Sequence, residues 1–137
     1  MWEIEFESDL FEPFLPGTHQ TSEDVYGFEL AEWLARRLAM RQIYASYPQA
    51  EDWGWSLQHA VEGLVILIGV RGVLPPLQEN ASGAERRLHW TLFVKPLPSM
   101  KQRLAGARVA DVQAPLISQI ELVLRAAGIN YRLAPSA

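Results

Sequence analysis

A chain of 137 residues with a net charge of −4 and no cysteine has the length of one domain, and 49% of its residues are apolar, which supplies a sizeable core. The lack of cysteine excludes disulfides, thiolate metal sites and thiol nucleophiles. The negative charge disfavours general nucleic-acid binding, which depends on neutralising phosphates. No signal-peptide pattern opens the chain, and its longest apolar run is shorter than the ~20 residues of a membrane span, so we expect a cytoplasmic protein without membrane contact.

The first predicted element is a strand at the start of the chain. From Trp2 to Glu7 apolar and acidic residues alternate strictly, so Glu3, Glu5 and Glu7 should face water while the other three residues face a core. Two interpretations of this acidic row stay open. At a sheet edge the glutamates would discourage aggregation between edges, whereas on a functional surface they would form a docking face for a basic partner.

A helix is predicted after a loop that covers Asp9 to Thr21. Either Thr21 or Ser22 is a suitable N-terminal cap, and apolar residues recur at helical spacing from Val25 to about Gln42. Glu32 and Arg36 form an i,i+4 pair in the favourable order.

The middle of the chain predicts a series of strands. A short strand from Ile43 to Tyr47 ends at Pro48, and strict alternation follows from Trp53 to Val61, with Trp53 and Trp55 on the same apolar face. Glu62-Gly63 forms a tight turn, and the run from Leu64 to Val70 is apolar on both faces, as in a central strand.

The second half continues with a long loop from Arg71 to Ala84 and a strand from Arg87 to Lys95, where Phe93 interrupts the outward polar set. Pro96 and Pro98 should end that strand. A single helical turn from Lys101 to Ala105 is expected next. A helix with Pro115 in its first turn and Gly128 at its C-terminal end follows, and then a short strand from Ile129 to Leu133.

The summed order is β-α-β-β-β-β-α-β over residues 1–137. We therefore predict a single α+β domain built on an antiparallel meander sheet with two helices on one face.

The segment from Glu51 to Trp55 is the main candidate for a binding site, because two tryptophans flank Gly54 beside two carboxylates. If the indoles are exposed, they suit a hot spot for a partner protein or a platform for a flat ligand. If they face the core under the first helix, Glu51 and Asp52 serve only the preceding turn.

No catalytic or metal site is predicted. Glu51 and Asp52 are adjacent in an extended segment, so their side chains diverge and a general acid/base pair is not supported. His59 falls on the apolar face of its strand and His89 on the polar face of another, which separates them. The chain also lacks nucleophile-elbow and phosphate-binding glycine motifs, so neither a cofactor nor a reaction class is indicated.

Charge is unevenly distributed along the chain. Residues 1–35 hold nine acidic side chains and no Lys or Arg, while the stretch from Arg86 to Arg108 holds six basic side chains and no acid. This polarity can be paired internally, between two subunits of a homodimer, or with a charged partner.

Four sequence features occur together in the first half of the chain: a proline-rich turn at Glu12 to Gly17, the helix sequence from Tyr26 to Leu34, Tyr47-Pro48, and the Glu-Asp-Trp-Gly-Trp segment from Glu51 to Trp55. Through these features the chain resembles a group of small bacterial proteins with no established activity. The resemblance covers about the first half of the chain. It implies a small bacterial α+β domain and brings no catalytic residue with it.

The favoured function is a non-enzymatic protein-binding module, in its narrower form an immunity-type or anti-defence inhibitor of a basic partner. The alternative is a small-molecule binding or enzymatic domain with a pocket at Glu51, Asp52 and Trp53. A third possibility is a homodimer in which the acidic row of one subunit faces the basic stretch of the other.

Overall fold

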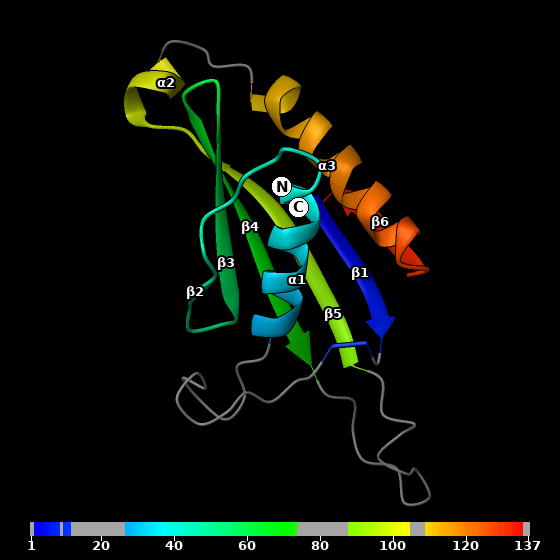
Figure 1. Cartoon of the computed structure of the whole chain (residues 1–137). Helices are drawn as coiled ribbons and strands as arrows, with labels where there is room; N and C mark the ends of the chain where they lie inside the picture. Colours follow the sequence, from blue (N-terminus) through cyan, green and yellow to red (C-terminus); the bar gives the residue numbers. More distant parts are fainter. Residues whose placement is uncertain (1, 9, 12–26, 74–87, 105–108, 136–137) are drawn as a thin grey trace, which may run out of the picture.

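The computed structural model describes residues 2–8, 10–11, 27–73, 88–104 and 109–135 (Figure 1). Its elements, in chain order, are β1 (Trp2–Ser8), α1 (Phe28–Ala39), β2 (Gln49–Ala50), β3 (Trp55–Val61), β4 (Leu64–Val73), β5 (Leu88–Leu97), α2 (Met100–Leu104), α3 (Val109–Ala126) and β6 (Tyr131–Pro135). The predicted α+β class and order are confirmed, with the predicted helical turn near Lys101 present as the short helix α2.

The six strands form one antiparallel sheet in the order β2-β3-β4-β5-β1-β6. The strands β2 to β5 follow one another as a meander, and β1 then lies between β5 and the C-terminal strand β6. The strand that carries the acidic row is therefore interior, with Glu5 opposite Thr91 on one side and Arg132 on the other. Protection of an exposed edge, which required β1 to be at the edge, is excluded for these glutamates.

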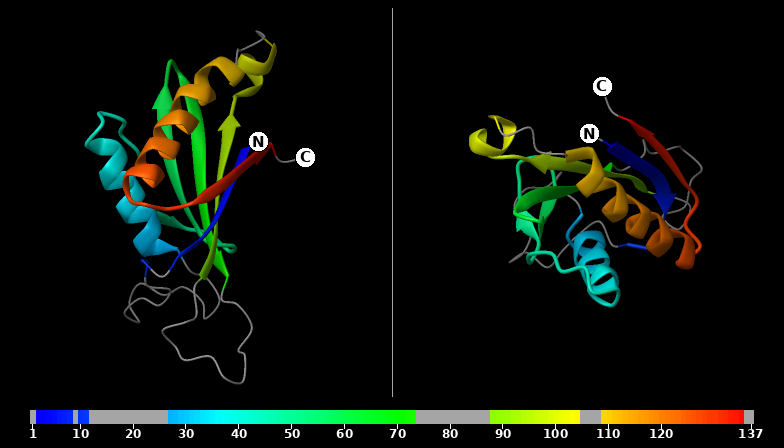
Figure 2. Two further views of the ribbon diagram at one scale, coloured as in Figure 1. Left: turned by 90° about the vertical axis from the view of Figure 1, so that its right-hand side faces the viewer. Right: turned by 90° about the horizontal axis from the view of Figure 1, so that it is seen from above.

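The helices α1 and α3 pack on the same face of the sheet, and Figure 2 shows both on one side of the strands. Side chains at alternate positions of the strands, such as Ile4, Trp90 and Ile68, are fully or almost fully buried against the two helices. A single hydrophobic cluster connects the sheet with both helices. This matches the predicted arrangement of one helical layer on one sheet.

The turn between β3 and β4 is the tight turn predicted at Glu62-Gly63. Both residues have positive φ, 51° for Glu62 and 78° for Gly63, and Val61 pairs with Leu64 across them. Two consecutive left-handed residues make a type I′ turn, whose twist matches that of the flanking strands.

The predicted strand from Ile43 to Tyr47 is wrong. Only Ala45 forms a bridge there, with His59, and the paired strand β2 lies further along, at Gln49–Ala50. The segment is held beside β3 partly by side-chain hydrogen bonds and not by a continuous backbone ladder. Ser46 Oγ accepts a hydrogen bond from the Gln58 backbone N–H, and His59 Nδ1 lies 2.8 Å from the Tyr44 carbonyl oxygen.

The first helix is shorter than predicted, beginning at Phe28 directly after Gly27 and ending at Ala39. The Glu32–Arg36 pair is confirmed as a salt bridge on its exposed side. The predicted caps Thr21 and Ser22 lie outside the described residues, as do the Glu12-to-Gly17 turn and residues 74–84 of the predicted long loop.

The second long helix was predicted to begin near Pro115, but α3 begins at Val109 and holds that proline in its interior. Its C-terminal end is as predicted. Gly128 has φ 75°, and the Ile129 N–H donates to the Leu124 carbonyl at 3.0 Å. This six-residue closure is the Schellman motif, which favours glycine at the left-handed position.

Two strands extend past their predicted ends. The strand β4 continues from Val70 to Val73, and β5 passes through Pro96 to Leu97. Pro96 is tolerated because β1 pairs with β5 only as far as Val94, so this part of β5 has β4 as its neighbour among the strands described. No helix in the described ranges has the length and apolar character required to cross a membrane.

Candidate functional site

The two tryptophans of the Glu51-to-Trp55 segment lie on opposite faces of the sheet, which corrects the prediction that they share one. Trp53 belongs to the loop between β2 and β3, since β3 begins only at Trp55. The loop is closed by a hydrogen bond of 2.8 Å from the Glu51 N–H to the Gly54 carbonyl oxygen. The strand alternation that would have aligned the indoles therefore does not reach Trp53.

Trp55 is a core residue. Its side chain is 6% exposed and meets Phe28 of α1 edge-on, with 4.9 Å between the ring centroids. The core interpretation is correct for Trp55, whose indole is too deeply buried to contact a partner.

Trp53 is half-buried on the other side of the sheet, which α1 and α3 leave uncovered. Its ring lies 4.9 Å from that of Phe93, centroid to centroid, at an interplanar angle of 51°. We call this side the open face. In the described residues it is lined by Trp53, Phe93, Glu51, Ser56, Val65, Leu67, Arg71, Lys95, Arg132 and the acidic row.

Phe93 is held under Trp53 by a glycine on the neighbouring strand. Gly69 of β4 pairs with Phe93 of β5, and a Cβ atom at Gly69 would collide with the Phe93 ring. The missing side chain lets the ring lie flat on the sheet, where the Trp53 indole packs against it. Sequence reasoning noted Phe93 only as a break in a polar pattern, and that break was the available signal.

The two carboxylates of the segment diverge as predicted. Glu51 is half-buried and accepts a hydrogen bond of 3.0 Å from the Ser56 hydroxyl, whereas Asp52 is exposed. Glu51 thus fixes the loop that carries Trp53. The geometry offers no convergent pair for acid/base chemistry at these two residues.

The acidic row runs beside the aromatic pair. Glu3 lies directly opposite Phe93 in the β1–β5 ladder, which joins the carboxylates and the aromatic rings into one continuous surface. Glu5 is engaged within the fold, 3.9 Å from His89 and 3.8 Å from Arg132, while Glu7 is exposed at the end of the strand. Glu7 is therefore the carboxylate of this row most accessible to a partner.

The face as a whole is mixed in charge. Its four carboxylates are accompanied by Arg71, Lys95 and Arg132 among the described residues. The negative potential is thus concentrated along β1 and does not extend over the whole sheet.

The histidines are separated as predicted. His59 points to the side of the helices, where its ring meets the Tyr44 carbonyl, and His89 points to the open face beside Glu5. Within the ranges that the structure describes, no group of His, Asp and Glu side chains is arranged to hold a metal ion.

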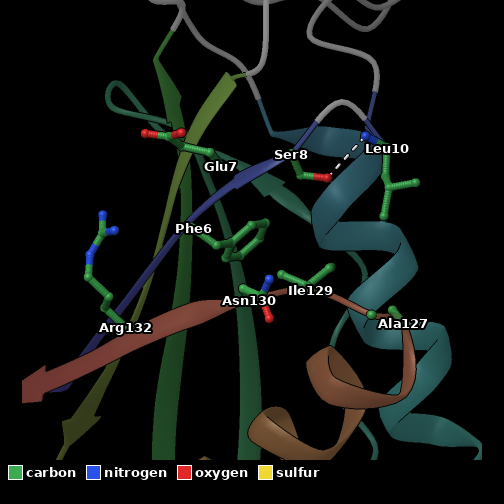
Figure 3. A pocket seen from close by; sticks show the side chains of 9 residues that line it. Phe6, Glu7, Ser8, Leu10, Ala127, Ile129, Asn130 and Arg132 are labelled. Atoms are coloured by element: carbon green, nitrogen blue, oxygen red, sulfur yellow. Dashed lines mark hydrogen bonds between the residues drawn. The ribbon is translucent and has the colours of Figure 1, made fainter.

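Three cavities lie away from the Glu51-to-Trp55 segment. One of about 450 Å³ is at the end of β1, where Figure 3 shows Glu7 and Arg132 on one side of the strand and Ser8, Leu10 and Ile129 on the other. The second and third, of about 260 and 570 Å³, follow the junction of α1 with α3. Of the predicted site residues, Glu7 alone lines one of these three.

The first of these cavities is bordered by the junction of α3 with β6. Near it, the Tyr131 hydroxyl donates a hydrogen bond of 2.9 Å to Glu121 Oε1. Burial, together with that hydrogen bond, raises the pKa of Tyr131 above its ordinary value of 10.0. The phenol therefore stays neutral at physiological pH and serves to fix β6 against α3.

Comparison of the chain with known protein families, with curated proteins and with solved structures gives no match.

Proposed function

We propose that this protein is a non-enzymatic protein-binding module whose open face captures a partner that presents basic and apolar side chains. The observation that carries the proposal is the Trp53–Phe93 pair, which lies on the sheet face away from both long helices. Half-buried aromatic rings held rigidly by their surroundings are typical hot spots of protein interfaces, because they lose little conformational freedom on binding.

The acidic row supports a basic partner. Glu3 adjoins the aromatic pair and Glu7 is exposed further along the same strand, so a cation beside an apolar group would meet both features at once. Charge complementarity of this kind governs partner selection and association rate more than total affinity. In its narrower form the proposal is an immunity-type or anti-defence inhibitor, which would act by covering a basic effector protein.

The alternative, a small-molecule site at Glu51, Asp52 and Trp53, has less support. Trp53 retains some exposure, but its ring is packed against Phe93 and Glu51 is bonded to Ser56. Both contacts stabilise the loop and leave these groups less available to a ligand.

The test is capture on the immobilised protein, followed by affinity measurement with each captured protein after purification. Trp53→Ala should weaken binding by about 2 kcal/mol or more, the scale of an interface hot spot. Glu7→Lys should weaken it by roughly tenfold and reduce its salt dependence. For the inhibitor form, an activity of the captured protein should fall when the wild-type chain is added and recover with Trp53→Ala.

Glu62→Lys is the matched control. It makes the same charge change at an exposed residue of the β3–β4 turn. Equal binding by the wild-type chain, Trp53→Ala and Glu7→Lys would exclude the open face as the docking surface, and a captured partner with an acidic surface would contradict the proposed charge complementarity.

A further inference from the structure

The junction of α1 and α3 forms a hollow surface on the opposite side of the sheet from the open face. Two adjoining cavities of about 260 and 570 Å³ share Met40 and Arg41 of the α1 end. On α3 the lining residues include Pro115, Gln119, Leu122 and Ala126. These four recur at spacings of three and four, so they form one stripe along the helix.

This groove is long enough for a helix. From Pro115 to Ala126 the α3 axis advances by about 16 Å at about 1.5 Å per residue, which is roughly three turns. The Arg41 side chain lines both hollows and donates a hydrogen bond to the Gln119 amide oxygen.

The groove has unusually exposed apolar side chains in its lining. Met40 is 74% exposed and Leu122 is 41% exposed, although both are large hydrophobic side chains. Trp33 contributes a half-buried indole next to them. Exposed apolar side chains that line a hollow, in contrast to scattered single ones, indicate a surface for another molecule.

Among the described residues, the charged side chains that line the groove are all basic. Arg37 and Arg41 line the smaller hollow, and neither hollow has an Asp or Glu among its lining residues. Arg37 stacks over the Trp33 ring, with its guanidinium carbon 5.6 Å from the ring centroid. The nearby acids of the helices are taken up elsewhere, Glu32 by Arg36 and Glu121 by Arg125 at 3.7 Å.

We propose that the groove between α1 and α3 binds an acidic amphipathic helix of a partner protein. The apolar side chains of the partner helix enter the two hollows in the i, i+3, i+4, i+7 pattern by which helices occupy grooves. Its carboxylates pair with Arg37 and Arg41, because a guanidinium group binds a carboxylate through two parallel hydrogen bonds. The hollow shape and the pair of arginines favour such a helix over a bilayer, which presents a broad surface to many cations at once.

The experiment uses a labelled helical peptide of about 14 residues, roughly four turns. It carries leucines on one side and glutamates on the flanks, and an analogue has lysines in place of the glutamates. Fluorescence anisotropy with the full chain should show that the acidic peptide binds. The lysine analogue should bind at least about tenfold more weakly than the acidic peptide. Binding of the acidic peptide should weaken as the salt concentration rises.

The double substitution Arg37→Glu and Arg41→Glu should reduce acidic-peptide affinity by tenfold or more and shift preference to the lysine analogue. Leu122→Asp, which adds a carboxylate inside the apolar hollow, should also reduce it. The matched control is the double substitution Lys101→Glu and Arg103→Glu. It makes the same charge change at exposed residues of α2 that line neither hollow, so the variant should bind within about twofold of the wild-type chain.

Five results would overturn the proposal. The first three are no binding of the acidic peptide, equal binding of both peptides, and an equal loss of affinity in the α2 control variant. The fourth is binding to anionic phosphatidylserine vesicles that the same arginine variants abolish. The fifth is concentration-dependent sedimentation removed by Arg37→Glu and Arg41→Glu, which would assign the groove to a second copy of the chain. Trp53→Ala should leave peptide binding intact, so this result is separate from the test of the open face.

Discussion

At the residue scale, the open face depends on Gly69. The Phe93 ring occupies the space that a side chain at Gly69 would take, and Trp53 packs on that ring at 4.9 Å between centroids. An aromatic ring over a cross-strand glycine compensates for the poor packing of glycine in a strand. The aromatic pair therefore depends on three segments: the loop that carries Trp53, β5 with Phe93 and β4 with Gly69. The contact can be tested by substitutions that leave Trp53 unchanged.

Gly69→Ala should displace the Phe93 ring and change the fluorescence of Trp53, with a loss of about 1–2 kcal/mol in the free energy of unfolding from overpacking. The control is the same substitution in a Phe93→Ala background, where the space is free and the added methyl group should cost little. A double-mutant cycle from urea unfolding measures the coupling between the two positions. Equal losses in both backgrounds would contradict the contact.

The two carboxylates and two tryptophans of residues 51–55 illustrate how neighbours diverge in role. Trp55 packs on Phe28 under α1, while Trp53 lies on the other side of the sheet. Glu51 is bonded to Ser56, and Asp52 is exposed. Of the two indoles, Trp53 is the one that is partly accessible, and Phe93 supports its ring, which is why the proposed docking surface is centred on it.

At the element scale, α3 is distinguished by the proline in its interior. Pro115 lacks the N–H that would bond to the preceding turn, and a proline inside a helix costs about 3 kcal/mol relative to alanine. Its side chain is exposed, so no core packing compensates for the loss. A sequence rule placed it in the first turn, where proline is favoured, and that rule gave the helix a start six residues too late, at 115 instead of 109.

Pro115→Ala should raise the free energy of unfolding by about 1–3 kcal/mol, as measured by urea denaturation. Ser118→Ala, at an exposed position one turn later in the same helix, is the control and should add only about 0.5 kcal/mol. A loss of stability in Pro115→Ala would contradict this prediction and would mean that Pro115 stabilises α3 in its present path along the sheet.

The short helix α2 is stabilised by hydrogen bonds from the side chains of two residues, Ser99 and Gln102. The Ser99 N–H donates to Gln102 Oε1 at 2.8 Å, and the Gln102 N–H donates to Ser99 Oγ at 3.1 Å, which is a reciprocal capping box. Gln102 Nε2 also donates to the Gly63 carbonyl at 2.6 Å. One glutamine thus caps α2 and attaches it to the β3–β4 turn.

At the scale of the whole molecule, the sheet separates two proposed binding surfaces. The open face has aromatic rings beside carboxylates, whereas the groove of the helical layer has apolar side chains beside arginines. Because the layer between them is a packed core, occupation of one surface does not obstruct the other. Taken together, the two proposals predict a protein that connects a basic partner with an acidic one.

We expect the chain to unfold as a single cooperative unit, since one hydrophobic cluster joins the sheet to both long helices. Far-ultraviolet circular dichroism follows the helices, and fluorescence reports on all five tryptophans, of which Trp55 and Trp90 lie in the core. Their urea transitions should coincide. A separate, earlier loss of helical signal would indicate that the helical layer melts on its own and would contradict the prediction of one domain.

The sequence by itself determined the elements whose signals are local. Alternation of apolar and polar residues predicted β1 and most of β3, and helical spacing predicted α1. Glu62-Gly63 predicted a turn and Gly128 predicted a helix end, because those backbone conformations depend on the residues that adopt them. It also placed Glu3, Glu5 and Glu7 on one face of their strand, as the register confirms.

Only the tertiary structure decided which segments meet. The position of β1 between β5 and β6, the packing of Trp53 on Phe93 above Gly69, and the groove between α1 and α3 all join residues that are distant along the chain. Local pattern carries no information about which strand becomes a neighbour or which helix faces cross. Those choices follow from burying one shared core, which is a property of the whole chain.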